Sequence, residues 1–150
     1  MQLSGQKILK ADNKAIWNLL MNPGSLARII PGISKLEKTA ENIYKSVLEI
    51  QIGPVSGYFE GTVELDEIVE NSSFNLKVRQ NSKIGDANAS VRIILSEVNL
   101  SETELAFNGE VKLTGLLARM GQRMVSGVAN TLIKQFFTNM EEELQKQFAA

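Results

Sequence analysis

Apolar and polar residues alternate along the middle of the chain, from Ile33 to about Leu113. A period of two is typical of strands that have one buried face and one face in water. Turn-forming residues interrupt the pattern at residues 53–54, 71–73, 85–86 and 99–101. Because the runs between these turns are short and closely spaced, we predict about six antiparallel strands joined as hairpins.

The last third of the chain has a helical pattern instead. After Thr114 and Gly115, an apolar residue occurs at every fourth position to about Phe148. We predict one continuous helix, roughly 45 Å long from the rise per residue of an α-helix. Its apolar stripe consists of Leu116, Met120, Met124, Val128, Leu132, Phe136, Met140, Leu144 and Phe148. A stripe of this length needs a wide apolar surface to cover it, and the strand rows provide one.

The start of the chain predicts one short strand and two short helices. Residues 2–10 form the strand, and Asp12 or Asn13 can cap the first helix through its side-chain oxygen. The sequence Asn-Pro-Gly at residues 22–24 ends that helix, and residues 25–29 form the second helical turn.

Together these elements predict a single α+β domain over residues 1–150. A curved antiparallel sheet of about seven strands wraps around the long C-terminal helix, and the two short helices follow the first strand. Gly57, Gly61 and Gly109 fall on the predicted inner face. Glycine at these positions permits strong curvature of the sheet or close approach of the helix.

This order of elements resembles the helix-grip fold of the START-like, or Bet v 1-like, superfamily (SRPBCC). Three segments also resemble the family named after the G subunit of carbon monoxide dehydrogenase. They are Ile30-Pro31-Gly32, the segment GPVSGYFEG at residues 53–61, and GLLARMGQRMVSGVANTLIKQFF at residues 115–137. The resemblance covers nearly the whole chain.

The resemblance implies an accessory role. Members of the family accompany molybdenum hydroxylases of the CO dehydrogenase type, help to recruit or assemble the enzyme at the cytoplasmic membrane, and are not its catalytic subunit. The fold usually holds an apolar ligand, such as a lipid or a quinone-like compound. Longer members carry an extension that serves as a membrane-binding tail, whereas this sequence ends at Ala150. We therefore expect membrane contact to be peripheral at most.

Composition removes several kinds of chemistry. The chain has no cysteine and no histidine, which excludes disulfides, thiolate metal sites and nucleophile systems that depend on histidine. The net charge of -1 and the absence of a basic stripe with interleaved aromatics argue against nucleic acid. The sequence contains no phosphate-binding loop and no metal-ligand cluster. We predict no catalytic residue, metal or cofactor, and a cytoplasmic location, to which the family resemblance adds peripheral contact with the inner face of the cell membrane.

The predicted ligand site lies between the long helix and the sheet. Met120 and Met124 are flexible and polarizable, as a pocket for varied apolar ligands requires. Gly121 and Gly127 each cost the helix about 1 kcal/mol relative to alanine, which a cavity or a close backbone crossing would offset. The alternative is that these residues pack a filled core. The candidate ligand-binding residues are Trp17, Leu20, Ile30, Pro31, Leu48, Ile50, Phe59, Val91, Ile93, Phe107, Met120, Met124 and Val128.

Two further features have alternative interpretations. The prediction is that Trp17, Ile29, Ile30 and Pro31 form an apolar lid at the cavity entrance, or else that Trp17 anchors the first helix on the sheet. Arg119 and Arg123 lie four residues apart on one predicted helix face. They contact an anionic partner or lipid headgroup, or else they form a solvated face and pair with strand carboxylates such as Glu110.

Two other functions remain open at this stage. Some proteins of the same fold are cyclases or hydratases, and such an enzyme needs a proton carrier on the inner face, where the rows contain almost no carboxylate. The other alternative is a protein-interaction module with a filled core and no ligand.

Overall fold

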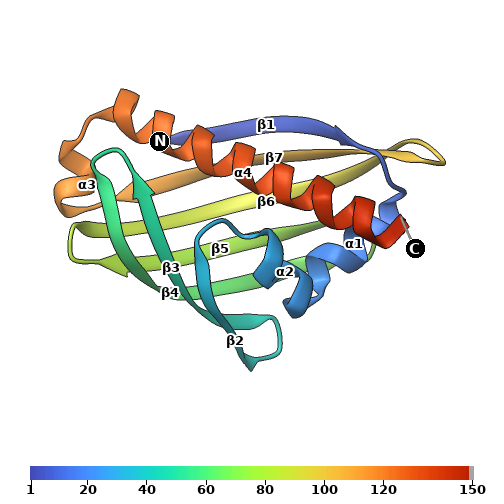
Figure 1. Cartoon of the computed structure of the whole chain (residues 1–150), viewed down its shortest axis with the longest axis horizontal. Helices are drawn as coiled ribbons and strands as arrows, with labels where there is room; N and C mark the ends of the chain where they lie inside the picture. Colours follow the sequence, from blue (N-terminus) through green and yellow to red (C-terminus); the bar gives the residue numbers. More distant parts are fainter. Residues whose placement is uncertain (149–150) are drawn as a thin grey trace.

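The computed structural model describes residues 1–148, which form one α+β unit around a single antiparallel sheet. The elements are β1 (Gln2–Leu9), α1 (Asn13–Met21), α2 (Pro23–Ile29), β2 (Ile33–Ala40), β3 (Ile43–Ile52), β4 (Val55–Val69), β5 (Ser73–Ser82), β6 (Gly85–Asn99), β7 (Glu102–Leu113), α3 (Gly115–Arg119) and α4 (Gln122–Phe148). The seven strands lie in the order β1-β7-β6-β5-β4-β3-β2, and every neighbouring pair is antiparallel. Figure 1 shows α4 crossing one face of the curved sheet, with α1 and α2 near its C-terminal end. The predicted fold class is confirmed.

The alternation of the strands produces the two faces of the sheet as predicted. In β6, Ile93 and Leu95 are buried, whereas the intervening Ile94 is 41% exposed. One predicted turn is displaced, because the chain reverses at residues 83–84 and Gly85 already belongs to β6. A Cβ atom on Gly85 would overlap the carbonyl oxygen of Thr114, so this glycine permits a close backbone approach.

Local capping interactions define the two short helices. The Asp12 carboxylate oxygen Oδ1 accepts a hydrogen bond from the Ala15 backbone N–H at 2.8 Å, as an N-cap does. The Asn22 side chain caps α2 in the same way through the Ser25 N–H at 3.2 Å. Helix α2 therefore begins at Pro23, earlier than predicted, because proline suits the first helical turn, where its missing N–H is not needed.

The continuous C-terminal helix predicted from Gly115 onward is wrong at its start. Gly121 adopts a φ of +86°, which no α-helix accommodates, and this residue separates α3 from α4. The apolar stripe consequently changes phase. Leu117 is buried, whereas Leu116 and Met124, which belong to the predicted stripe, are 51% and 45% exposed.

The glycines of the inner face permit crowding between strands rather than approach of the helix. A Cβ atom on Gly61 would overlap the Arg79 carbonyl oxygen of β5, and one on Gly109 would overlap the Ser90 carbonyl oxygen of β6. Both positions therefore accept only glycine without a shift of the neighbouring backbone.

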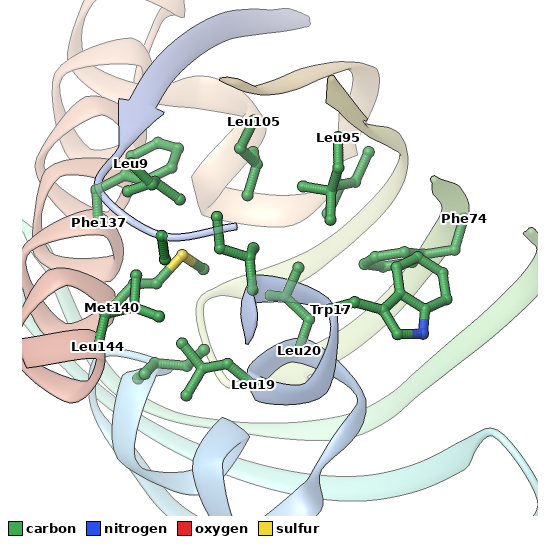
Figure 2. Packing of buried hydrophobic residues seen from close by; sticks show 14 of the residues in the cluster. Leu9, Trp17, Leu19, Leu20, Phe74, Leu95, Leu105, Phe137, Met140 and Leu144 are labelled. Atoms are coloured by element: carbon green, nitrogen blue, oxygen red, sulfur yellow. The ribbon is translucent and has the colours of Figure 1, made fainter. Parts of the chain in front are cut away.

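The main hydrophobic core lies where the second half of α4 meets α1 and the sheet. Figure 2 shows Met140 and Leu144 of α4 beside Leu19 of α1, with Leu105 and Leu95 of the sheet above them. A smaller cluster lies near α3 and contains Ile50, Val55, Phe59 and Leu117. Residues of both clusters line cavities that lie between the sheet and α4.

An ion pair between the half-exposed Arg28 and the buried Glu143 joins α2 to α4. The Arg28 Nε donates to Glu143 Oε2 at 3.0 Å, and Lys146 Nζ lies 3.5 Å from Oε1 of the same carboxylate. The hydrogen bond from Arg28 holds the pKa of Glu143 below its usual range, against the opposing effect of burial. Nearby, Asn139 Nδ2 donates to the Ile29 carbonyl oxygen at 3.2 Å. These contacts set the position of α2, and hence of the loop that follows it, relative to α4.

We expect the substitution Glu143→Gln to lower the free energy of unfolding by about 1 kcal/mol at neutral pH, since it removes a charge-assisted hydrogen bond. The folded-state pKa of Glu143 is depressed. Its contribution is therefore complete above the unfolded-state pKa and disappears as the pH falls through the folded-state pKa. Urea titrations at neutral pH and in acid measure both effects. Glu142→Gln, at an exposed neighbour, is the control, and an equal loss in both variants at neutral pH would contradict this account.

Candidate ligand-binding cavity

Three adjoining apolar cavities lie between α4 and the concave face of the sheet. The outer cavity, near α3, has a volume of about 280 Å³ and is lined by Phe59, Leu117 and Val128 among others. The central cavity measures about 330 Å³, and the inner cavity, near α1 and α2, about 210 Å³. Leu48 of β3 lines all three. Together they fall within the roughly 300–1,000 Å³ of typical small-molecule sites.

The central cavity brings the α2–β2 turn onto the sheet and the helix. Ile30 and Pro31 line it from the turn, while Phe107 of β7 lies opposite Phe137 of α4, with 6.2 Å between the ring centroids. Phe136 packs edge-on against Phe137 at 5.7 Å. Every residue that lines this cavity is apolar, so the space favours a guest that buries hydrocarbon or aromatic surface.

The structure places ten of the thirteen predicted ligand-binding residues on these cavities. They are Leu20, Ile30, Pro31, Leu48, Ile50, Phe59, Val91, Ile93, Phe107 and Val128. Strand alternation and the helical period placed eight of these residues on inward faces, whereas Ile30 and Pro31 lie in the turn between α2 and β2. The curvature of the sheet gathers them around one space.

The other three predicted residues lie elsewhere. Trp17 is 5% exposed and packs edge-on against Phe74, with 5.8 Å between the ring centroids, so it anchors α1 on β5 instead of covering an entrance (Figure 2). Met120 packs against the Ile50–Leu117 cluster without lining any of the three cavities. Met124 is 45% exposed, because residues four apart in an α-helix are displaced by about 40° per step, so a stripe of every fourth residue does not stay on the buried side over the whole of α4.

Sequence reasoning missed one polar residue of the site, Gln80. It is 4% exposed and lines both the outer and the inner cavity. The period-two row Phe74, Leu76, Val78 continues to this position, so the alternation already placed it on the inner face. Its polarity obscured that signal.

The two arginines predicted to share a helix face do not share one. Arg119 is the last residue of α3 and Arg123 lies in the first turn of α4, with the break at Gly121 between them. Both are exposed, and within residues 1–148 neither forms an ion pair. Glu110, considered as their partner, instead accepts a hydrogen bond from Gln2 Nε2 at 3.0 Å.

Within the part of the chain that the structure describes, no cluster of three or more carboxylates could hold a metal ion. The helices over the same residues include none with the length and apolar character required to cross a bilayer.

Comparison with known proteins identifies the family. The family model for the G subunit of carbon monoxide dehydrogenase (CoxG) matches residues 5–145. The chain belongs to the CoxG family. This confirms the resemblance carried by the segments at residues 30–32, 53–61 and 115–137. No curated protein matches the chain.

Solved structures share the fold of this chain. A conserved protein from Geobacillus kaustophilus is similar with a TM-score of 0.95 and 32% identity, over 97% of this chain and 96% of that one. A START superfamily protein from Mycobacterium smegmatis has a TM-score of 0.76 at 14% identity, over 97% and 98% of the two chains. The protein TTHA0849 from Thermus thermophilus has a TM-score of 0.77 at 10% identity, over 98% and 99%. The START-like fold is thereby confirmed, and CoxG membership with this fold supports an accessory, ligand-binding type of protein.

Proposed function

We propose that this CoxG-family chain is a non-catalytic accessory protein. It holds an apolar ligand, a lipid or a quinone-like compound, between α4 and the sheet. It assists the recruitment or assembly of a molybdenum hydroxylase of the CO dehydrogenase type at the inner face of the cytoplasmic membrane. The observation that carries the ligand-binding part is the set of three adjoining cavities with almost wholly apolar linings. The partner and the location rest on the family.

Apolar burial supplies the affinity in this proposal. A guest that leaves water for these cavities gains about 25 cal/mol for each Å² of apolar surface buried. The linings come from all seven strands, from the helices and from the turn at Ile30 and Pro31, so the guest would contact the protein on several sides. An enclosed apolar guest is protected from water during transfer to or from a larger partner.

The lining residues offer little for acid–base chemistry. No carboxylate, lysine or arginine is among the described residues that line the three cavities, and Tyr44 carries their one titratable side chain. The buried carboxylate of Glu143 is engaged by Arg28 and lines none of these cavities. A cyclase or hydratase mechanism needs a positioned proton carrier with a suitable pKa, and this arrangement favours binding over catalysis.

Gentle purification followed by native mass spectrometry tests the proposal. The tagged chain is produced together with a CO-dehydrogenase-type hydroxylase from the same genome and is purified without detergent. We expect a small noncovalent adduct that is lost at higher collision energy, and a complex with the hydroxylase. A complex without any adduct, and without uptake of oleate or a short-chain prenylated quinone, would instead indicate a ligand-free interaction module. The absence of both adduct and complex would overturn the proposal.

A further inference from the structure

The cavity linings contain one buried hydrogen-bonding atom without a partner. Gln80 is 4% exposed, and its amide oxygen Oε1 is buried and accepts no hydrogen bond from residues 1–148. The one other such side-chain atom in that range, Asp66 Oδ1, belongs to a partly exposed ion pair with Lys77 outside the cavities. The unpaired amide oxygen therefore distinguishes Gln80 from the rest of the site.

Three neighbouring strands hold Gln80 in this position. Ser46 of β3, Gly61 of β4 and Gln80 of β5 are cross-strand partners in one row. Gly61 lies between the other two residues in this row, and Gln80 Nε2 donates to Ser46 Oγ at 2.9 Å. This bond engages the nitrogen of the amide, whereas the oxygen has no partner.

We infer that Gln80 selects a guest that carries a hydroxyl group on an otherwise apolar body, such as a phenol (including the hydroquinone form of a quinone-like compound) or a long-chain alcohol. In the complex, the guest hydroxyl donates a hydrogen bond to Gln80 Oε1. The inference rests on the proposed function, which it deepens by naming the polar group of the ligand and its position, at the boundary of the outer and inner cavities.

Energetics favour such a guest. An unsatisfied buried acceptor costs about 1–3 kcal/mol, and a guest hydroxyl removes that cost when it binds. A purely hydrocarbon guest fills the same space but leaves the oxygen unpaired.

A matched pair of probes tests this inference. Naphthol and methylnaphthalene have nearly the same size and differ in one hydroxyl donor. Their dissociation constants are measured for the wild-type protein and for Gln80→Met, which keeps the approximate volume and removes the acceptor. We expect the preference for naphthol over methylnaphthalene to fall about tenfold in Gln80→Met, as for the loss of one net hydrogen bond. Asn81→Met, at an exposed neighbour on the same strand, should keep the wild-type preference.

The outcomes separate this inference from the proposed function. If both probes bind and the preference is the same in the wild type and in Gln80→Met, the role of Gln80 is refuted while the cavity remains a ligand site. A wild-type preference for acetylnaphthalene, which carries a carbonyl acceptor, would likewise refute it, because the amide would then present Nε2 to the guest. If no probe binds the wild-type protein, the proposed function itself fails. Thermal melting of Gln80→Met shows that the variant is folded.

Discussion

The variant Ala129→Phe is expected to bind an apolar probe such as methylnaphthalene at least about tenfold more weakly than the wild-type protein, a loss of about 1.4 kcal/mol or more. Ala129 lies on α4 and lines the outer cavity, whose volume is about 280 Å³. A phenyl ring at this position takes up space that the guest would occupy. Because the ring enters an existing void, we expect the free energy of unfolding to be unchanged or higher, as for other cavity-filling substitutions.

The neighbouring residue provides the control for this prediction. Asn130 is exposed on α4, and Asn130→Phe adds an aromatic ring outside the cavities, so its affinity for the probe should remain that of the wild type. Fluorescence titration of each variant measures the affinities, and urea unfolding measures the stabilities. Equal affinity in Ala129→Phe and the wild type would place the guest outside the outer cavity and contradict the proposed site.

The largest effect on stability is expected for Met140→Ala. Met140 is fully buried and points from α4 into the main core beside Leu144 and Leu19 (Figure 2). Its truncation removes apolar contacts and leaves a cavity, so the free energy of unfolding should fall by about 2–5 kcal/mol. Chemical denaturation followed by circular dichroism measures this loss.

The same substitution at a second methionine of α4 is the control. Met124 is 45% exposed, and Met124→Ala should change the free energy of unfolding by no more than about 0.5 kcal/mol. The sequence pattern places both methionines in one apolar stripe, whereas the 3.6-residue turn of α4 displaces positions four apart by about 40° per step, so that Met140 is buried and Met124 is not. Similar losses in the two variants would mean that α4 begins in a different phase from the one described.

Much of the fold follows from local patterns. Strand alternation identified the inward rows of the sheet, and ten of the residues chosen from these rows and from the helices line the cavities. The cap at Asp12 was recognisable because its hydrogen bond joins residues only three positions apart. The break at Gly121 was missed because a glycine within a helical pattern does not reveal whether its φ is negative or positive.

The ion pair between Arg28 and Glu143 was also missed, because its partners are 115 residues apart. Nothing in the sequence near Glu143 distinguishes it from Glu141 and Glu142, which are adjacent and equally charged. The packing of α2 against α4 places the Arg28 guanidinium next to Glu143. This contact distinguishes Glu143 from the two neighbouring carboxylates.

The amino-acid sequence by itself determined which faces of the strands are apolar, where the first short helix begins, which family the chain resembles, and that histidine and cysteine chemistry are excluded. These properties depend on residue type and on neighbours within a few positions. Tertiary structure alone decided that α4 and the sheet enclose cavities, that Trp17 and Met124 lie apart from them, and that Gln80 keeps an unpaired oxygen. Voids and buried polar atoms without hydrogen-bond partners depend on how segments distant in the sequence pack together. The local periodicity of the sequence does not predict that packing.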